Sequence, residues 1–100
     1  MKVALIKKLT WDEWNISHIK RYGVKPAEVE QSIKDQFVVF IQGHSNRVML
    51  LGRSGKRLIT TVLQQQETKS LCYVVTARDM AKKERVIYRK EKARKEQNDK

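Results

Sequence analysis

Four short segments rich in β-branched and aromatic residues dominate the middle of the sequence and most limit the folds open to it. They span residues 37–41, 48–51, 58–63 and 71–76. Such segments are typical of β-strands, and strands joined by short connections pair in antiparallel order. Turn-forming residues separate them at 42–46 and 52–55, and a polar connection follows at 64–70. The pattern therefore predicts a four-stranded antiparallel meander.

Helix signals flank this β-rich region on both sides. Thr10-Trp11-Asp12-Glu13 matches the capping box S/T-x-x-E, which predicts a helix that begins between residues 11 and 13. Gly23 predicts the end of that helix, and Pro26 predicts the first turn of a second one. The pattern becomes helical again after Ala77 and continues to about Arg94 or beyond.

Together these segments predict an α+β fold. A four-stranded antiparallel sheet carries two N-terminal helices and a long C-terminal helix, and residues 3–6 leave open a further short edge strand. The chain has 100 residues, a length that supports one hydrophobic core. We expect residues 1–100 to form a single domain, with 91–100 as a frayed or disordered basic tail.

The charge of the chain is the first indication of function. Lys and Arg number 22 against 11 Asp and Glu, which gives a net charge of +11. Such a balance predicts attraction to polyanions, most commonly nucleic acid, with an acidic protein or a membrane surface as alternatives. The longest apolar run, 37–41, is far shorter than the roughly 20 residues of a membrane span. With Cys72 as the single cysteine, we expect a cytoplasmic location.

The sequence carries few signals for metal or cofactor chemistry. His18, His44 and Cys72 show no recognisable ligand spacing, and the four glycines form neither a Walker A nor a dinucleotide motif. Cys72 lies in the middle of a predicted strand, where a small buried hydrophobic side chain is the expected role. We therefore expect no metal and no cofactor.

Cleavage of RNA is a reaction that needs no metal. A base removes the proton of the 2′-hydroxyl, an acid protonates the leaving oxygen, and cations stabilise the charge on the phosphate. The candidate proton carriers are His18, Glu84 and Tyr88. The candidate phosphate clamps, chosen because guanidinium matches phosphate geometry, are Arg47, Arg53, Arg57, Arg78 and Arg85.

Each candidate also has a structural interpretation. His18 fits a core-edge histidine bonded to backbone, and Tyr88 fits a packing residue with a wetted hydroxyl. Arg78 follows a buried strand, so packing should fix its head either in a bridge to Glu84 or at an anion site.

The two tryptophans near the first predicted helix, Trp11 and Trp14, allow two roles. Either indole can stack on a nucleic-acid base. Aromatic side chains on a helix of a small domain, however, usually belong to the core. The core role is therefore the expected one.

Several short motifs follow one another in a characteristic order. They are W-D-x-x-N-x-x-H at 11–18, Gly23-Val24, the Pro26 helix, T-A-R-x-M at 76–80 and E-R-x-x-Y at 84–88. This ordered set covers roughly residues 10–90 and resembles the BrnT-like toxins of prokaryotic type II toxin–antitoxin modules. The resemblance implies a RelE-like ribonuclease fold and RNA cleavage that inhibits translation. It also implies neutralisation by a BrnA-like ribbon-helix-helix antitoxin, with operator DNA bound only through the complex.

The resemblance also suggests which residues act. It implies a catalytic set of His18, Arg78, Glu84, Arg85 and Tyr88. It implies an RNA-binding set of Lys20, Arg47, Arg53 and Arg57, to which the basic run adds Lys82 and Lys83.

The sequence departs from the family pattern in three places. Tyr22 stands where many members have histidine, the segment between Ile41 and Arg47 is short and lacks an acidic stretch, and the basic extension beyond Lys90 is longer than in many relatives. The missing histidine at position 22 and the structural interpretation of His18 support an alternative. A catalytically weak or inactive basic protein, which binds nucleic acid or antitoxin as a regulatory subunit, is therefore the second hypothesis.

Overall fold

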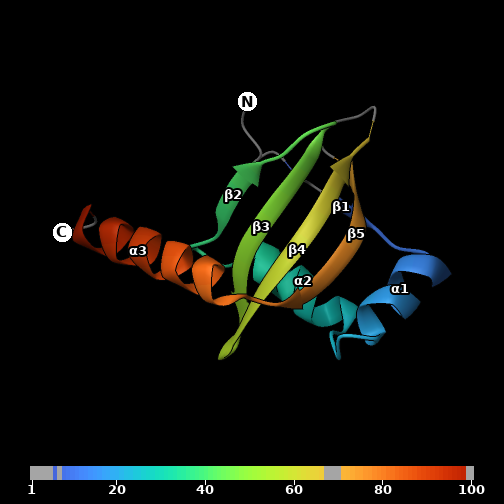
Figure 1. The fold of residues 1–100 in the computed structure, drawn as a ribbon, viewed down its shortest axis with the longest axis horizontal. Coiled ribbons are helices and arrows are strands. Elements are labelled where there is room, and N and C mark those ends of the chain that lie inside the picture. Colours follow the sequence, from blue (N-terminus) through green and yellow to red (C-terminus); the bar gives the residue numbers. More distant parts are fainter. Residues whose placement is uncertain (1–5, 7, 67–70, 99–100) are drawn as a thin grey trace.

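A five-stranded sheet forms the centre of the computed structural model, which describes residues 6, 8–66 and 71–98 (Figure 1). The elements in chain order are β1 (Lys8–Thr10), α1 (Glu13–Lys20), α2 (Pro26–Ile33), β2 (Val39–Gln42), β3 (Arg47–Ser54), β4 (Arg57–Gln65), β5 (Leu71–Asp79) and α3 (Lys82–Asn98). The strand order across the sheet is β1-β5-β4-β3-β2. The α+β class predicted from the sequence is confirmed. No helix among the described residues is long and apolar enough to cross a membrane.

The sheet differs from the predicted one at its β1 edge. Strands β2 to β5 pair antiparallel as predicted, but β1 adds a fifth strand parallel to β5, with Lys8 opposite Leu71 and Thr10 opposite Tyr73. The optional strand at 3–6 is not this strand: residues 3–5 lie outside the described residues, and Ile6 precedes β1. Three residues with no alternating pattern give little signal, and their partner lies about sixty residues away.

The helices divide between the two faces of the sheet. Leu50 and Leu51 are neighbours in β3, so their side chains point to opposite faces. Leu50 belongs to the main core, which α1 and α2 cover with side chains such as Ile19 and Val29. Leu51 belongs to a second, smaller cluster, to which α3 contributes Tyr88. Figure 1 shows α3 extending away from the sheet beyond this contact.

The cap of α1 differs from the predicted one. Asp12, and not Thr10, is the N-cap: its side chain accepts from the Asn15 N–H at 2.9 Å, and the Asn15 amide oxygen accepts from the Asp12 N–H at 2.9 Å. Thr10 is the last residue of β1, and its carbonyl accepts from the Asn15 side chain. The predictions at Gly23, which has a φ of +70°, and at Pro26, the first residue of α2, are confirmed.

The turn predicted at 52–55 is wrong, because β3 continues through Gly52 to Ser54. The chain reverses at Gly55-Lys56, where Gly55 has a φ of +61°. Gly52 is required inside the strand for another reason. A Cβ there would clash with the carbonyl oxygen of Ser32, so the glycine allows α2 to approach the sheet closely.

Helix α3 continues to Asn98, in line with the prediction that it reaches about Arg94 or beyond, and residues 99–100 lie outside the described part. That residues 91–100 form a frayed or disordered tail stays a prediction. Arg94 pairs with Glu91 at 2.6 Å one turn away, and Lys95 donates to the Val38 carbonyl at 3.1 Å. These contacts extend the helix beyond the region that packs on the sheet.

Candidate nucleic-acid interface

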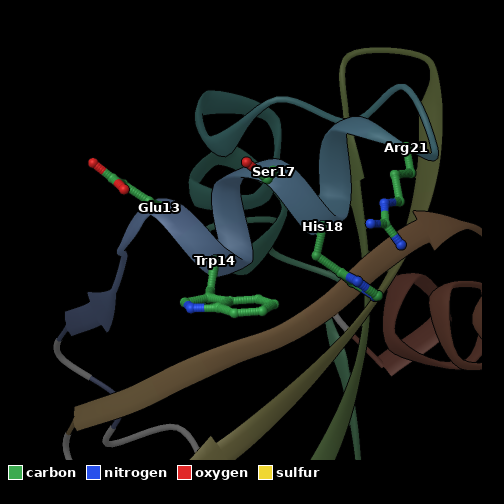
Figure 2. A pocket seen from close by; sticks show the side chains of 5 residues that line it. All are labelled: Glu13, Trp14, Ser17, His18 and Arg21. Carbon is green, nitrogen blue, oxygen red and sulfur yellow. The ribbon is translucent and has the colours of Figure 1, made fainter.

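A groove of about 320 Å³ runs along the exposed side of α1. Its lining residues are Glu13, Trp14, Ser17, His18 and Arg21. Spacings of three, four and seven positions place these side chains on one side of a helix. Figure 2 shows Trp14, His18 and Arg21 pointing from the helix toward β5, whereas Glu13 points away. The floor of the groove therefore combines an indole, an imidazole and a guanidinium.

Trp14 contradicts the expectation that both tryptophans belong to the core. Trp11 is half-buried against the main core and its indole N–H donates to Glu30 at 2.8 Å. Trp14 is 83% exposed. Within α1 the buried residues are Asn15 and Ile19, and Trp14 is not among them. Trp14 offers a flat apolar surface that gains most from covering by another flat ring.

His18 contacts a second exposed aromatic side chain, Tyr22. The two rings meet edge to face, with centroids 5.7 Å apart and an angle of 66° between their planes. Tyr22 is 49% exposed and His18 is half-buried. The hydrogen bonds from Arg78 to Glu84, more than any effect of Tyr22, raise the pKa of the Arg78 guanidinium. The end of α1 thus brings an imidazole and a phenol together.

Arg78 and Glu84 form a two-pronged ion pair, one of the two arrangements the sequence allowed. Arg78 Nη1 and Nη2 donate to the two carboxylate oxygens of Glu84 at 2.8 and 2.9 Å. Glu84 also accepts from the Thr60 hydroxyl at 2.8 Å and from the Ala81 N–H at 2.6 Å. These hydrogen bonds, the one from Arg78 first, lower the pKa of Glu84 to about 2. Glu84 is therefore a permanent anion that holds Arg78 in place.

Tyr88 occupies a packing position in the second cluster. Its side chain is 2% exposed, and its hydroxyl donates to the Asp35 carboxylate. Burial, and then this carboxylate, raise the pKa of Tyr88 above its ordinary value. A phenol so enclosed does not face solvent, and its position favours a structural role over direct proton transfer to a substrate.

Two further arginines of the predicted sets join elements of the fold. Arg57 pairs with Glu28 at 3.0 Å and with Asp79 at 2.7 Å. It also donates to the Gly23 carbonyl at 2.8 Å, which ties the β3–β4 hairpin to the end of α1. Arg85 donates to the Met80 carbonyl at 2.7 Å, just before α3 begins. Arg57 thus ties the hairpin to the chain after α1, and Arg85 holds the junction between β5 and α3.

The remaining RNA-binding candidates lie on exposed surfaces. Exposed side chains from three elements belong to this group: Lys20, Arg47, Arg53, Lys82 and Lys83. Arg47 donates to the Gln64 side chain at 3.2 Å, on the α3 side of the sheet. Arg53 faces a separate basic pocket beside α3. These residues do not meet at a single point.

The structure therefore regroups the predicted residues. It places His18 against Tyr22, joins Arg78 to Glu84, and buries the ring of Tyr88 in the second cluster. The sequence analysis did not assign Arg21, although its seven-residue spacing from Trp14 places the two on one helix face. The seven-residue spacing of Trp14 and Arg21 is therefore the sequence signal for the groove.

Comparisons with known proteins add no assignment. Models of known protein families were compared with the sequence and none matches, and a search among curated proteins likewise found no match. Within the described residues, no group of three or more His, Cys, Asp or Glu side chains is arranged to hold a metal ion. The chemistry of the groove is therefore the basis on which a function is proposed.

Proposed function

We propose that this protein is a metal-independent ribonuclease of the BrnT-like toxin type, which binds RNA in the α1 groove. The observation that carries the proposal is the exposed cluster of Trp14, His18 and Arg21 beside Tyr22 on a chain of net charge +11. Stacking on the indole and contact with cations are the two interactions that hold single-stranded nucleic acid. RNA is thus the substrate class that best suits the groove.

The proposed reaction uses the groups that face solvent. His18 removes the proton of an RNA 2′-hydroxyl, since imidazole is the side chain that exchanges protons most readily near neutral pH. The 2′-oxygen then attacks the adjacent phosphorus, the bond to the 5′-oxygen breaks, and Tyr22 gives its proton to that oxygen. Arg21 and Arg78 stabilise the negative charge that builds on the phosphate. The products are a 2′,3′-cyclic phosphate and a free 5′-hydroxyl.

The other predicted catalytic residues support the reacting side chains and do not touch the substrate. Glu84 is a positioning residue, because its two carboxylate oxygens orient the Arg78 guanidinium. Arg85 and Tyr88 maintain the β5–α3 junction and its packing. In a type II module the same basic surface would bind a BrnA-like antitoxin, which blocks the toxin and brings the complex to operator DNA.

Incubation of RNA with the purified protein in EDTA tests the proposal, with the two histidines as a matched pair. His44 lies exposed in the segment between β2 and β3, away from the groove, so His44→Ala serves as the control. We expect the wild type and His44→Ala to cleave, and His18→Ala to cleave at least about 100-fold more slowly. Equal rates in the two variants would remove His18 from the site.

A second candidate function is binding without cleavage. The engagement of Glu84 and Tyr88 in structural contacts favours it, because two of the three predicted proton carriers then face no substrate. Pure protein that leaves RNA intact, yet binds it with an affinity that falls steeply with salt, would identify this function. Growth arrest on expression then separates a toxin that acts only on ribosomes from an inactive one.

A further inference from the structure

A second pocket, of about 290 Å³, lies between the β3–β4 hairpin and α3. It is lined by Arg53, Gly55, Lys56, Leu58, Tyr88, Arg89 and Lys92. Four of these residues are cations, two from the hairpin and two from the helix. Leu58 and the buried ring of Tyr88 supply the apolar part of its wall.

No acidic residue of the described part of the chain lines this pocket, and the acids nearby are engaged elsewhere. Asp35 accepts the Tyr88 hydroxyl, Glu91 pairs with Arg94, and Asp79 pairs with Arg57. Among the described residues, none of the four pocket cations forms an ion pair. The pocket therefore gathers four positive charges whose mutual repulsion an anion would relieve.

The pocket is also held in shape. A two-residue turn at Gly55-Lys56 joins β3 to β4, and Arg57 fastens that hairpin to α1 and α2 through Gly23 and Glu28. On the helix side, the Lys92 ammonium lies 5.5 Å from the centre of the Phe37 ring, which restrains its long side chain. Cations on a fixed frame bind an anion at lower entropic cost than cations on a mobile tail.

We propose that this pocket is a phosphate-binding site that holds the backbone of RNA. Guanidinium groups match phosphate oxygens in a bidentate manner, and Arg53 and Arg89 face the pocket from its two sides. Of the four pocket cations, only Arg53 belongs to the RNA-binding set predicted from the sequence; Lys56, Arg89 and Lys92 are added by the pocket. The assignment to RNA rests on the proposed function, but the phosphate site itself is argued from the pocket alone.

The test uses two double variants of equal charge. Arg53→Gln with Arg89→Gln removes one cation from each side of the pocket. Lys8→Gln with Lys90→Gln removes two exposed cations that do not line it. All four side chains are exposed, so both variants should fold, which their circular dichroism checks. The ligand is a fluorescent 2′-O-methyl oligouridylate, which lacks the attacking hydroxyl and cannot be cleaved.

Fluorescence anisotropy across a range of salt concentrations gives the result. We expect the pocket variant to bind roughly tenfold more weakly. The slope of log K against log salt concentration should also be smaller in magnitude by about 1.4. Each contact with a single-strand phosphate contributes about 0.7 to that slope, and the variant loses two cations. The control variant should keep the wild-type slope. Equal losses of RNA affinity in the two variants would mean that overall positive charge, and not this pocket, holds the RNA. That result would overturn the proposed site.

Pyrophosphate, titrated calorimetrically, separates this inference from the proposed function. Pyrophosphate binding that the pocket variant loses, in a protein that binds no RNA, would support the phosphate site and overturn both the RNA assignment and the proposed function. Retained RNA binding by the pocket variant, together with lost binding to phosphatidylglycerol vesicles, would make a lipid headgroup the ligand and overturn the assignment to RNA.

Discussion

Helices α1 and α3 carry similar residue types and use them in opposite ways. On α1, Trp14 faces solvent, and His18 faces the groove beside the exposed Tyr22 just past the end of the helix. On α3, Tyr88 is buried against Asp35, and Glu84 is enclosed by hydrogen bonds from Arg78 and its neighbours. The helix with accessible chemistry lies over the main core, whereas the helix with enclosed chemistry anchors the second cluster.

This difference shows that residue type alone does not identify a site. A tyrosine with its hydroxyl given to a half-buried carboxylate contributes packing, and a tyrosine with half its surface in water is free to meet a ligand. We therefore expect substitutions of the enclosed α3 residues Glu84 and Tyr88 to change the free energy of unfolding, and substitutions on α1 to change RNA binding and cleavage. The following predictions test that division.

The largest effect is expected for Tyr88→Ala. Removing this fully buried ring leaves a cavity in the second cluster, and we expect a loss of about 3–5 kcal/mol in the free energy of unfolding. Urea denaturation monitored by circular dichroism measures it. A loss below about 1 kcal/mol would mean that α3 does not depend on this contact and would weaken the structural role given to it.

The second-largest effect is a dependence of the free energy of unfolding on pH. The pKa of Glu84 is about 2 in the folded protein against an ordinary 4.5. The folded state therefore binds the proton less readily, so the stabilisation is complete above about pH 4.5 and is lost as the pH falls toward 2. The shift corresponds to about 3 kcal/mol.

Urea denaturation at several pH values, with Glu84→Gln as the comparison, checks this origin. We expect the variant to be less stable than the wild type at pH 7 and to lack this component of the acid dependence. If wild type and variant lost stability in parallel between pH 4.5 and 2, the ion pair with Arg78 would not be its source.

A moderate effect is expected at the exposed indole. Trp14→Ala should weaken the binding of single-stranded RNA by about 1–3 kcal/mol, the range for loss of one stacking aromatic. Ile87→Ala is the matched control, because Ile87 is an exposed apolar residue on α3. Fluorescence anisotropy with the uncleavable oligonucleotide should leave the control unchanged. Equal weakening in both variants would mean that the exposed indole of Trp14 does not stack on RNA.

The smallest effect concerns the stability of the groove variants. His18→Ala removes a half-buried ring whose identified contact is the edge of Tyr22, so we expect the free energy of unfolding to change by no more than about 0.5 kcal/mol. Thermal and urea denaturation provide the check. A loss of several kcal/mol would make His18 a structural residue, and any loss of cleavage would then follow from unfolding.

The sequence predicted the central part of the fold because its signals are local. The alternating segments identified β2 to β5, and the conformational limits of Gly23 and Pro26 identified the boundaries of α1 and α2. Long-range contacts could not be predicted in the same way. Strand β1 gains its order from β5, and Gly52 looked like a turn residue although the approach of Ser32 requires it within a strand.

The candidate site was predictable only in part. Arg78 and Glu84 lie six positions apart across a strand–helix junction, and their bridge was one of two stated alternatives. The exposure of Trp14 was not predictable from residue type, because it depends on which side of α1 packs on the sheet. The neighbouring Trp11, of the same residue type, packs against the core instead.

Photo-cross-linking tests most directly whether RNA lies on α1. RNA containing 4-thiouridine is irradiated with the protein, and the attached peptides are located by mass spectrometry after digestion. We predict cross-links within residues 13–22, at the aromatic side chains of Trp14 and Tyr22, which Trp14→Ala reduces and Ile87→Ala does not. Cross-links confined to residues 82–98, with none on α1, would contradict the assignment of the groove as the RNA site.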